Sequence, residues 1–164
     1  MLPRGRPVLY SSRMGLRERF TEEMKAAMRA KEVRRLSTIR LMLDAVQKQD
    51  IASKSGDISD DEVLTVLGRM IKQREESAAV YDTGNRPELA KAEREEIVVI
   101  REFMPKQMSA DEVNAAVKAA IAATGAASMK DMGKVMAALK ERYAGQMDFG
   151  KASGLVKELL TPKS

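Results

Sequence analysis

Two Gly-Lys pairs near the C-terminus, Gly133-Lys134 and Gly150-Lys151, are the first candidates for chemistry. Glycine followed by lysine ends the nucleotide-binding loop GxxxxGK[ST], in which backbone N–H groups cradle phosphates and a hydroxyl holds magnesium. Gly125 lies too far before Gly133 for this pattern, and Val135 stands where the hydroxyl is needed. No strand is predicted before either pair. The sequence therefore excludes a nucleotide loop of this type.

A plainer phosphate site is compatible with the first pair. Ser128 is predicted to begin a helix, where free N–H groups and the positive end of the helix dipole can attract an anion. Lys130 and Lys134 are one turn apart on that helix. Glycine at position 133 costs about 1 kcal/mol relative to alanine, so either phosphate approach or close helix packing is expected there. Lys151 is a further candidate, although its glycine is explained as readily by capping and packing.

A basic run between residues 25 and 40 is the second candidate surface. It contains six cations and one acid, Glu32. Arg34, Arg35 and Arg40 are the residues proposed to meet a phosphate backbone. The alternative is a solvated face whose cations complement the end of a helix. Aromatic residues make up only 4% of the chain, so any RNA contact is expected to use shape and phosphate rather than base stacking.

The absence of cysteine and histidine removes much of enzyme chemistry. It excludes a thiol nucleophile, an imidazole base and the usual zinc sites. The glutamates of residues 75–76, 93–96 and 102 could face one another in a bundle, but a di-metal site of the known kind also needs histidine. Solvated ion pairs are the expected role of these glutamates. No catalytic residue, metal or cofactor is predicted.

Helix signals follow one another along nearly the whole chain, and the predicted fold class is all-α. Ser59, Ser109 and Ser128 each precede an acid by the capping-box spacing. Residues 14–105 are predicted to form an N-terminal helical domain and residues 106–162 a C-terminal three-helix bundle, with the break near Pro105. Residues 1–13 are expected to be a disordered leader or an over-extended start. Helices are predicted at 15–30, 32–53, 60–82, 87–103, 110–123, 129–144 and 149–161.

No apolar run reaches the roughly 18 residues that cross a bilayer, and no signal-peptide core is visible. A cytoplasmic protein without a membrane partner is therefore expected. The net charge of +5 is a mild excess. It allows attraction to nucleic acid without demanding it.

Several segments resemble the GatB/YqeY family over residues 14–162. The most specific is Met129–Met136 followed by Gly145–Asp148. The others are Arg40–Ala45, Ile71–Arg74, Ser77–Tyr81 and Phe103–Met108. The chain departs from the usual family pattern at Gln146 and Met147, where a more basic stretch is usual, and at Pro87. The first departure weakens any phosphate contact at that turn.

The resemblance implies a relative of the C-terminal tail of GatB, a component of the glutamine-dependent aspartyl/glutamyl-tRNA amidotransferase. It implies a tRNA-associated accessory protein, with tRNA, the amidotransferase or an aminoacyl-tRNA synthetase as possible partners. Family members also carry the label of carbon–nitrogen ligase with glutamine as amido-N-donor. This chain lacks a phosphate loop and an amidase-like segment, so the isolated chain is expected to bind rather than catalyse. The alternatives are a component of an amide-transfer enzyme whose active site lies in a partner, and a protein–protein adaptor that docks through its Met-rich tail.

Overall fold

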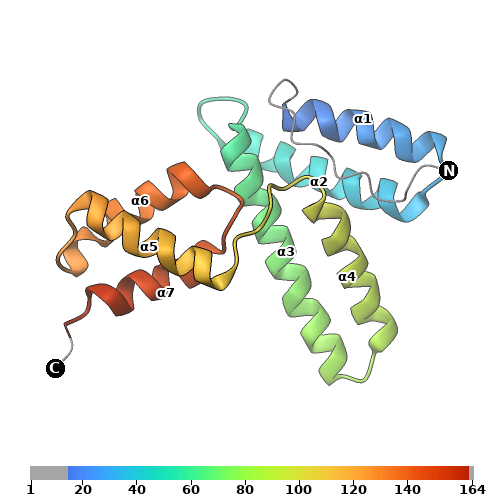
Figure 1. Ribbon diagram of the computed structural model, residues 1–164. Coiled ribbons are helices and arrows are strands. Elements are labelled where there is room, and N and C mark those ends of the chain that lie inside the picture. The colour runs from blue at the N-terminus through green and yellow to red at the C-terminus, as the bar shows by residue number, and fades with distance from the viewer. Residues whose placement is uncertain (1–14, 163–164) are drawn as a thin grey trace. The chain divides into compact units, whose positions relative to one another are not determined.

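A computed structural model describes residues 15–162, and Figure 1 shows them as helices joined by short loops. Within these residues there are seven α-helices, one short 3-10 helix and no strand. The predicted all-α fold class is confirmed. By its contacts the chain divides into two compact units, Met1–Pro105 and Lys106–Ser164. That these units are independent domains stays a prediction, and the expectation for residues 1–13 lies outside the described residues.

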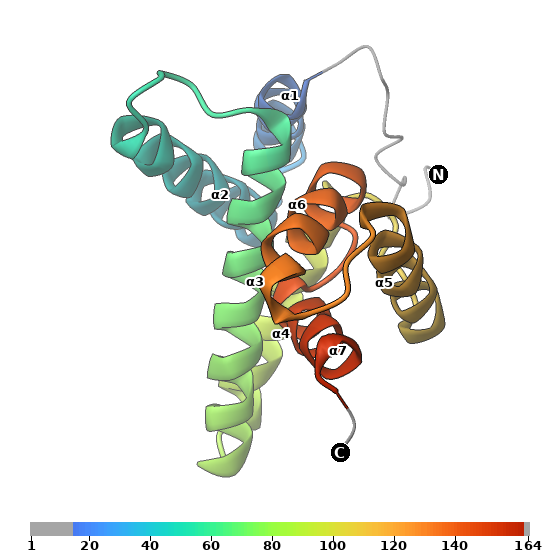
Figure 2. The ribbon, with the colours of Figure 1, turned by 90° about the vertical axis from the view of Figure 1, so that its left-hand side faces the viewer.

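The first unit consists of two helical hairpins, α1 (Leu16–Arg29) with α2 (Val33–Ala52) and α3 (Asp60–Thr83) with α4 (Pro87–Arg101). In both views α3 and α4 run side by side over most of their length (Figures 1 and 2). Ser59 begins α3, because its side chain accepts a hydrogen bond from the Glu62 N–H at 3.2 Å. Pro87 occupies the first turn of α4, where its missing N–H costs nothing.

The core of the first unit joins side chains from all four helices. Phe20 of α1 meets Phe103, which follows α4, with ring centroids 5.0 Å apart at an interplanar angle of 73°. The guanidinium groups of Arg19 and Arg35 lie 5.7 Å and 5.9 Å from the centre of the Phe103 ring. These cations stack on an aromatic face and so help to fix the segment after α4. The aliphatic part of the core includes Ile39, Met42, Val63, Leu67 and Ile100.

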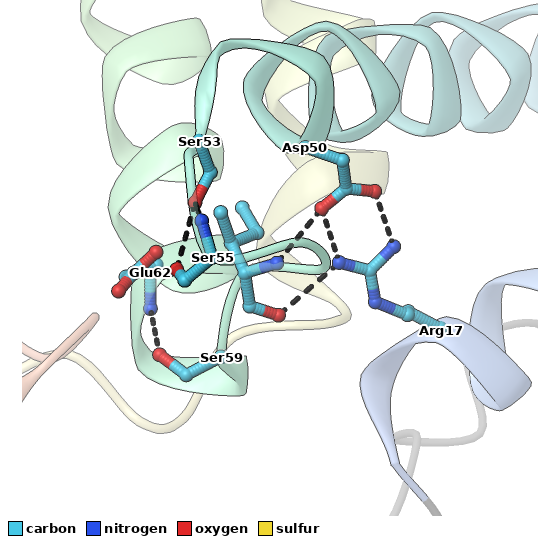
Figure 3. Close-up of polar contacts among 7 residues, drawn as sticks. Arg17, Asp50, Ser53, Ser55, Ser59 and Glu62 are labelled. Carbon is cyan, nitrogen blue, oxygen red and sulfur yellow. Dashed lines mark hydrogen bonds and ion pairs between the residues drawn. The ribbon is translucent and has the colours of Figure 1, made fainter.

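A polar contact fixes the loop between α2 and α3 (Figure 3). Arg17 of α1 donates to both carboxylate oxygens of Asp50 at 2.7 Å and 2.6 Å, and to the carbonyl of Ile58 at 3.1 Å. Asp50 also accepts from the Ile58 N–H at 2.9 Å. The hydrogen bond from Arg17, followed by that from Ile58, lowers the pKa of Asp50 to about 2.

The second unit is a three-helix arrangement of α5 (Ala110–Thr124), α6 (Met132–Tyr143) and α7 (Phe149–Leu160), with the 3-10 helix η1 (Met129–Asp131) before α6. Ser109 and Glu112 form a capping box at the start of α5, with both hydrogen bonds at 3.1 Å. Gly125 ends α5 at φ +66°, a backbone conformation that favours glycine. The apolar faces meet in a core of Val117, Val135, Leu139, Ala152 and Val156.

Within the part of the chain that the structure describes, no helix is both long enough and apolar enough to cross a membrane.

Candidate nucleic-acid interface

Gly133 lies exposed in the first turn of α6, between Lys130 and Lys134, which are also exposed. A Cβ built at Gly133 meets no atom within 4 Å. Packing against neighbouring residues therefore does not require a glycine at this position. Its bare backbone is open to an approaching group, and a lysine stands on either side of it. We call Lys130, Gly133 and Lys134 the tail surface.

The carboxylate of Asp131 binds backbone N–H groups at the start of this helical segment. Asp131 accepts hydrogen bonds from the N–H groups of Ala127 at 3.0 Å and Ser128 at 3.4 Å. These bonds lower the pKa of Asp131, and the positive charge of Lys134 lowers it further. The two N–H groups are thus satisfied by the protein itself. The lysine ammonium groups and the open backbone at Gly133 remain as the anion-attracting features of the tail surface.

A third cation, Lys157, belongs to the same end of the second unit. The hydroxyl of Thr161 contacts the sulfur of Met129 at 3.9 Å, which ties the end of α7 to η1. Thr161 also donates to the carbonyl of Lys157, one turn earlier. Lys157 is not among the residues predicted from the sequence, because only the folded arrangement brings the end of α7 beside the residue that precedes Lys130.

Lys151 does not join the tail surface. It lies in the first turn of α7, about 15 Å along the helix axis from Thr161. Asp148 caps this helix by accepting from the N–H groups of Gly150 at 2.8 Å and Lys151 at 3.3 Å. A Cβ at Gly150 would lie 3.1 Å from the Asp148 carboxylate. The second Gly-Lys pair therefore has a structural explanation, which the first pair lacks.

The three arginines of α2 differ in their surroundings. Arg35 has a side chain only 19% exposed and pairs with Glu102 and, at 3.1 Å, with Glu23. Arg34 is 84% exposed and pairs with Glu95 at 2.6 Å. Arg40 is exposed and forms no ion pair within residues 15–162. Arg35 is thus engaged by carboxylates of its own unit, whereas Arg34 and Arg40 remain accessible.

Three glutamates of α3 and α4 are ion-pair partners: Glu75, Glu95 and Glu96. Arg74 binds Glu96 at 2.7 Å, and Arg101 binds Glu75 at 3.1 Å. Among the described residues, no group of three or more acidic side chains is placed to hold a metal ion. The accessible chemistry is accordingly that of cations beside an open backbone, which can bind phosphate groups by charge and hydrogen bonds.

Comparison with curated proteins gives relatives named "Altered inheritance of mitochondria protein 41, mitochondrial". The protein of Kluyveromyces lactis is 31% identical over 82 residues, which are 50% of this chain and 44% of that protein. The protein of Clavispora lusitaniae is 33% identical over 82 residues, 50% of this chain and 47% of its own length. The chain thus spans about half the length of the curated relatives it matches.

These names contradict the expectation of a cytoplasmic protein, because the relatives are named as mitochondrial. That expectation rested on the lack of a spanning segment and of a signal-peptide core, and neither feature distinguishes the cytoplasm from other aqueous compartments.

The family itself is identified over most of the chain. The sequence profile described as "Yqey-like protein" matches residues 17–160, which include all seven helices except the first residue of α1. The family is related to the C-terminal part of GatB, so the resemblance inferred from the sequence is confirmed. The chain belongs to the YqeY-like protein family.

Proposed function

We propose that this protein is a tRNA-associated accessory module that contacts RNA phosphates through the tail surface. The observation that carries the proposal is the open, exposed backbone of Gly133 between two exposed lysines. A helical glycine without a packing role is a disadvantage to the isolated fold. Close approach of a ligand group is a physical reason for keeping it.

The relation of the family to GatB favours tRNA among nucleic acids. The scarcity of aromatic residues, at 4% of the chain, favours phosphate and shape recognition over base stacking. Lys157, at the same end of the second unit, would add a further phosphate contact. Arg34 and Arg40 of α2 are proposed as secondary phosphate contacts. Arg35 is left out, because its side chain is only 19% exposed and several carboxylates bind it, whereas the pair of Arg34 with Glu95 is exposed.

The test is tRNA binding by the full chain across a salt series. Wild type is compared with Lys130→Gln/Lys134→Gln and with the control Lys118→Gln/Lys140→Gln, which removes the same charge from other exposed positions of the second unit. If each lysine of the tail surface neutralises one phosphate, the slope of log K against log salt should fall by about 1.8. The control should keep most of the slope, and circular dichroism should show intact helices in all three proteins.

Each outcome decides between the functions that the sequence left open. Equal losses in both variants would mean attraction to net charge without a tail surface. Absence of binding by wild type at low salt would reject the tRNA role for this chain and favour a protein–protein adaptor. ATP- and glutamine-dependent amide formation with a purified partner would instead favour a component of an amide-transfer enzyme.

A further inference from the structure

The turn between α1 and α2 carries exposed apolar side chains among exposed cations. Val33 is 76% exposed and Met28 is 51% exposed. Lys25, Arg29 and Lys31 are exposed beside them and form no ion pair within residues 15–162. We call these five residues the apex surface, because they belong to the end of α1, the connection after it and the first residue of α2.

Backbone hydrogen bonds hold the apex surface together. The Lys31 N–H donates to the Met28 carbonyl at 3.2 Å, and the Glu32 N–H donates to the Ala27 carbonyl at 2.9 Å. Lys31 has φ +57°, a left-handed conformation in which glycine is favoured over lysine. The chain nevertheless places a long cationic side chain at this tight turn. The two exposed apolar residues therefore flank a cation that is fixed at the tip of the hairpin.

Acids lie beside the apex surface, but none of them pairs with Lys25, Arg29 or Lys31 within the described residues. Arg34 pairs with Glu95, whereas the single charge of Arg35 faces three carboxylates, Glu23, Glu32 and Glu102. Two further acids of α1, at positions 18 and 22, lie further from the turn. The acids around Arg35 reduce the net positive charge of the region, but the three cations of the apex surface stay exposed and unpaired beside Met28 and Val33.

We infer that the apex surface binds the face of an anionic phospholipid bilayer. Lipid headgroups attract the cations, and the headgroup–acyl boundary accepts apolar side chains such as Met28 and Val33. RNA phosphate would use only the cations. RNA would leave the exposed Met28 and Val33 without an apolar environment. This inference departs from the expectation of no membrane partner, which considered only spanning segments.

Membrane binding by the apex surface does not depend on the tail surface. One test can therefore distinguish it from the proposed tRNA binding. Full-length protein is sedimented with phosphatidylcholine vesicles that contain either no anionic lipid or about one third phosphatidylglycerol. Binding to the anionic vesicles alone is expected, and Lys130→Gln/Lys134→Gln should retain it. Lys25→Gln/Arg29→Gln/Lys31→Gln should weaken it roughly 100-fold, because each cation contributes about fivefold.

The apolar residues provide the distinguishing variant. Met28→Ser/Val33→Ser should weaken vesicle binding roughly tenfold, because it removes the apolar area that enters the bilayer. The matched control is Val80→Ser/Arg86→Gln/Lys91→Gln, which changes an exposed apolar side chain and two exposed cations at the α3–α4 turn. It should bind as wild type does.

Three results would overturn the inference: no binding to anionic vesicles, equal losses in the control, or binding that needs the cations but not Met28 and Val33. The last result, accompanied by weaker tRNA binding in the charge variant, would assign the apex surface to RNA instead.

Discussion

At Gly133, the residue type that would best stabilise the fold differs from the one that the proposed tRNA binding needs. Alanine has open space there, so Gly133→Ala should raise the free energy of unfolding by up to about 1 kcal/mol. The same change should weaken tRNA binding, because a Cβ keeps a phosphate away from the backbone. Urea denaturation and a binding titration measure the two effects.

Gly68→Ala is the control, since Gly68 is a helical glycine of the first unit with no atom within 4 Å of a built Cβ. It should stabilise the protein similarly and leave tRNA binding unchanged. A Gly133→Ala protein that binds tRNA as wild type does would contradict the close-approach argument.

Arg34 and Arg35 are adjacent in sequence and differ in energetic role. Arg35→Met leaves the half-buried Glu23 and Glu102 without their cation, and should lower the free energy of unfolding by about 2 kcal/mol or more. Arg34→Met breaks an exposed pair and should cost less than about 1 kcal/mol. Thermal and urea denaturation of both variants measures the difference. Similar losses would mean that the Phe103 contact and the carboxylates around Arg35 contribute little.

The sequence could not distinguish these two arginines. Glu23 and Glu102, the partners with which Arg35 forms hydrogen bonds, come from α1 and from the residue after α4, 12 and 67 residues away along the chain. Charge runs reveal how many cations a segment holds, whereas the fold decides which of them are neutralised. Lys157 was missed for the same reason, because the contact with η1 is made by Thr161, one turn after Lys157, and depends on how α7 packs.

At the level of elements, helix ends were predictable because caps are local. The side chains of Ser59 and Ser109 accept the hydrogen bonds that their positions indicated. The segment after Ser128 was less predictable: it begins as a 3-10 helix, and Asp131 bonds back to Ala127 as well as to Ser128. Lys31 and Asn85 have left-handed backbone conformations, and no glycine marks either position in the sequence.

The contact between Arg17 and Asp50 predicts how acid affects the first unit. An aspartate in the unfolded chain has a pKa of about 4, whereas the folded protein lowers the pKa of Asp50 to about 2. Because the folded pKa is lower, the stabilisation is fully present above about pH 4 and is lost as pH falls toward 2.

Asp50→Asn should therefore lose less stability than wild type when urea denaturation at pH 5 is compared with that at pH 3, values on either side of the pKa of an unfolded aspartate. Asp44→Asn is the control, since Asp44 is exposed on α2 and forms no ion pair in the described chain. It should keep the acid sensitivity of wild type. Equal acid sensitivity in all three proteins would show that Asp50 does not hold the α2–α3 loop.

For the whole molecule, the fold class and the family were accessible from sequence, whereas cellular location was not. Helical periodicity and capping signals extend along the chain, and the family segments are spread through both units. Location depends on targeting rather than on packing, and the mitochondrial names of the relatives corrected that expectation. The tail surface and the apex surface belong to different units, so variants of one should leave the other intact.

The most direct test of the proposed function uses the absence of cysteine from the chain. A single cysteine at Ala137, exposed one turn beyond Gly133 on α6, reports access to the tail surface without altering its residues. A second protein with Ala119→Cys on the exposed face of α5 is the control. The measurement is the rate of thiol alkylation with and without tRNA. We expect tRNA to slow alkylation at position 137 severalfold, added salt to remove the protection, and position 119 to be unaffected. Equal alkylation at position 137 with and without bound tRNA would contradict the proposed role of the tail surface.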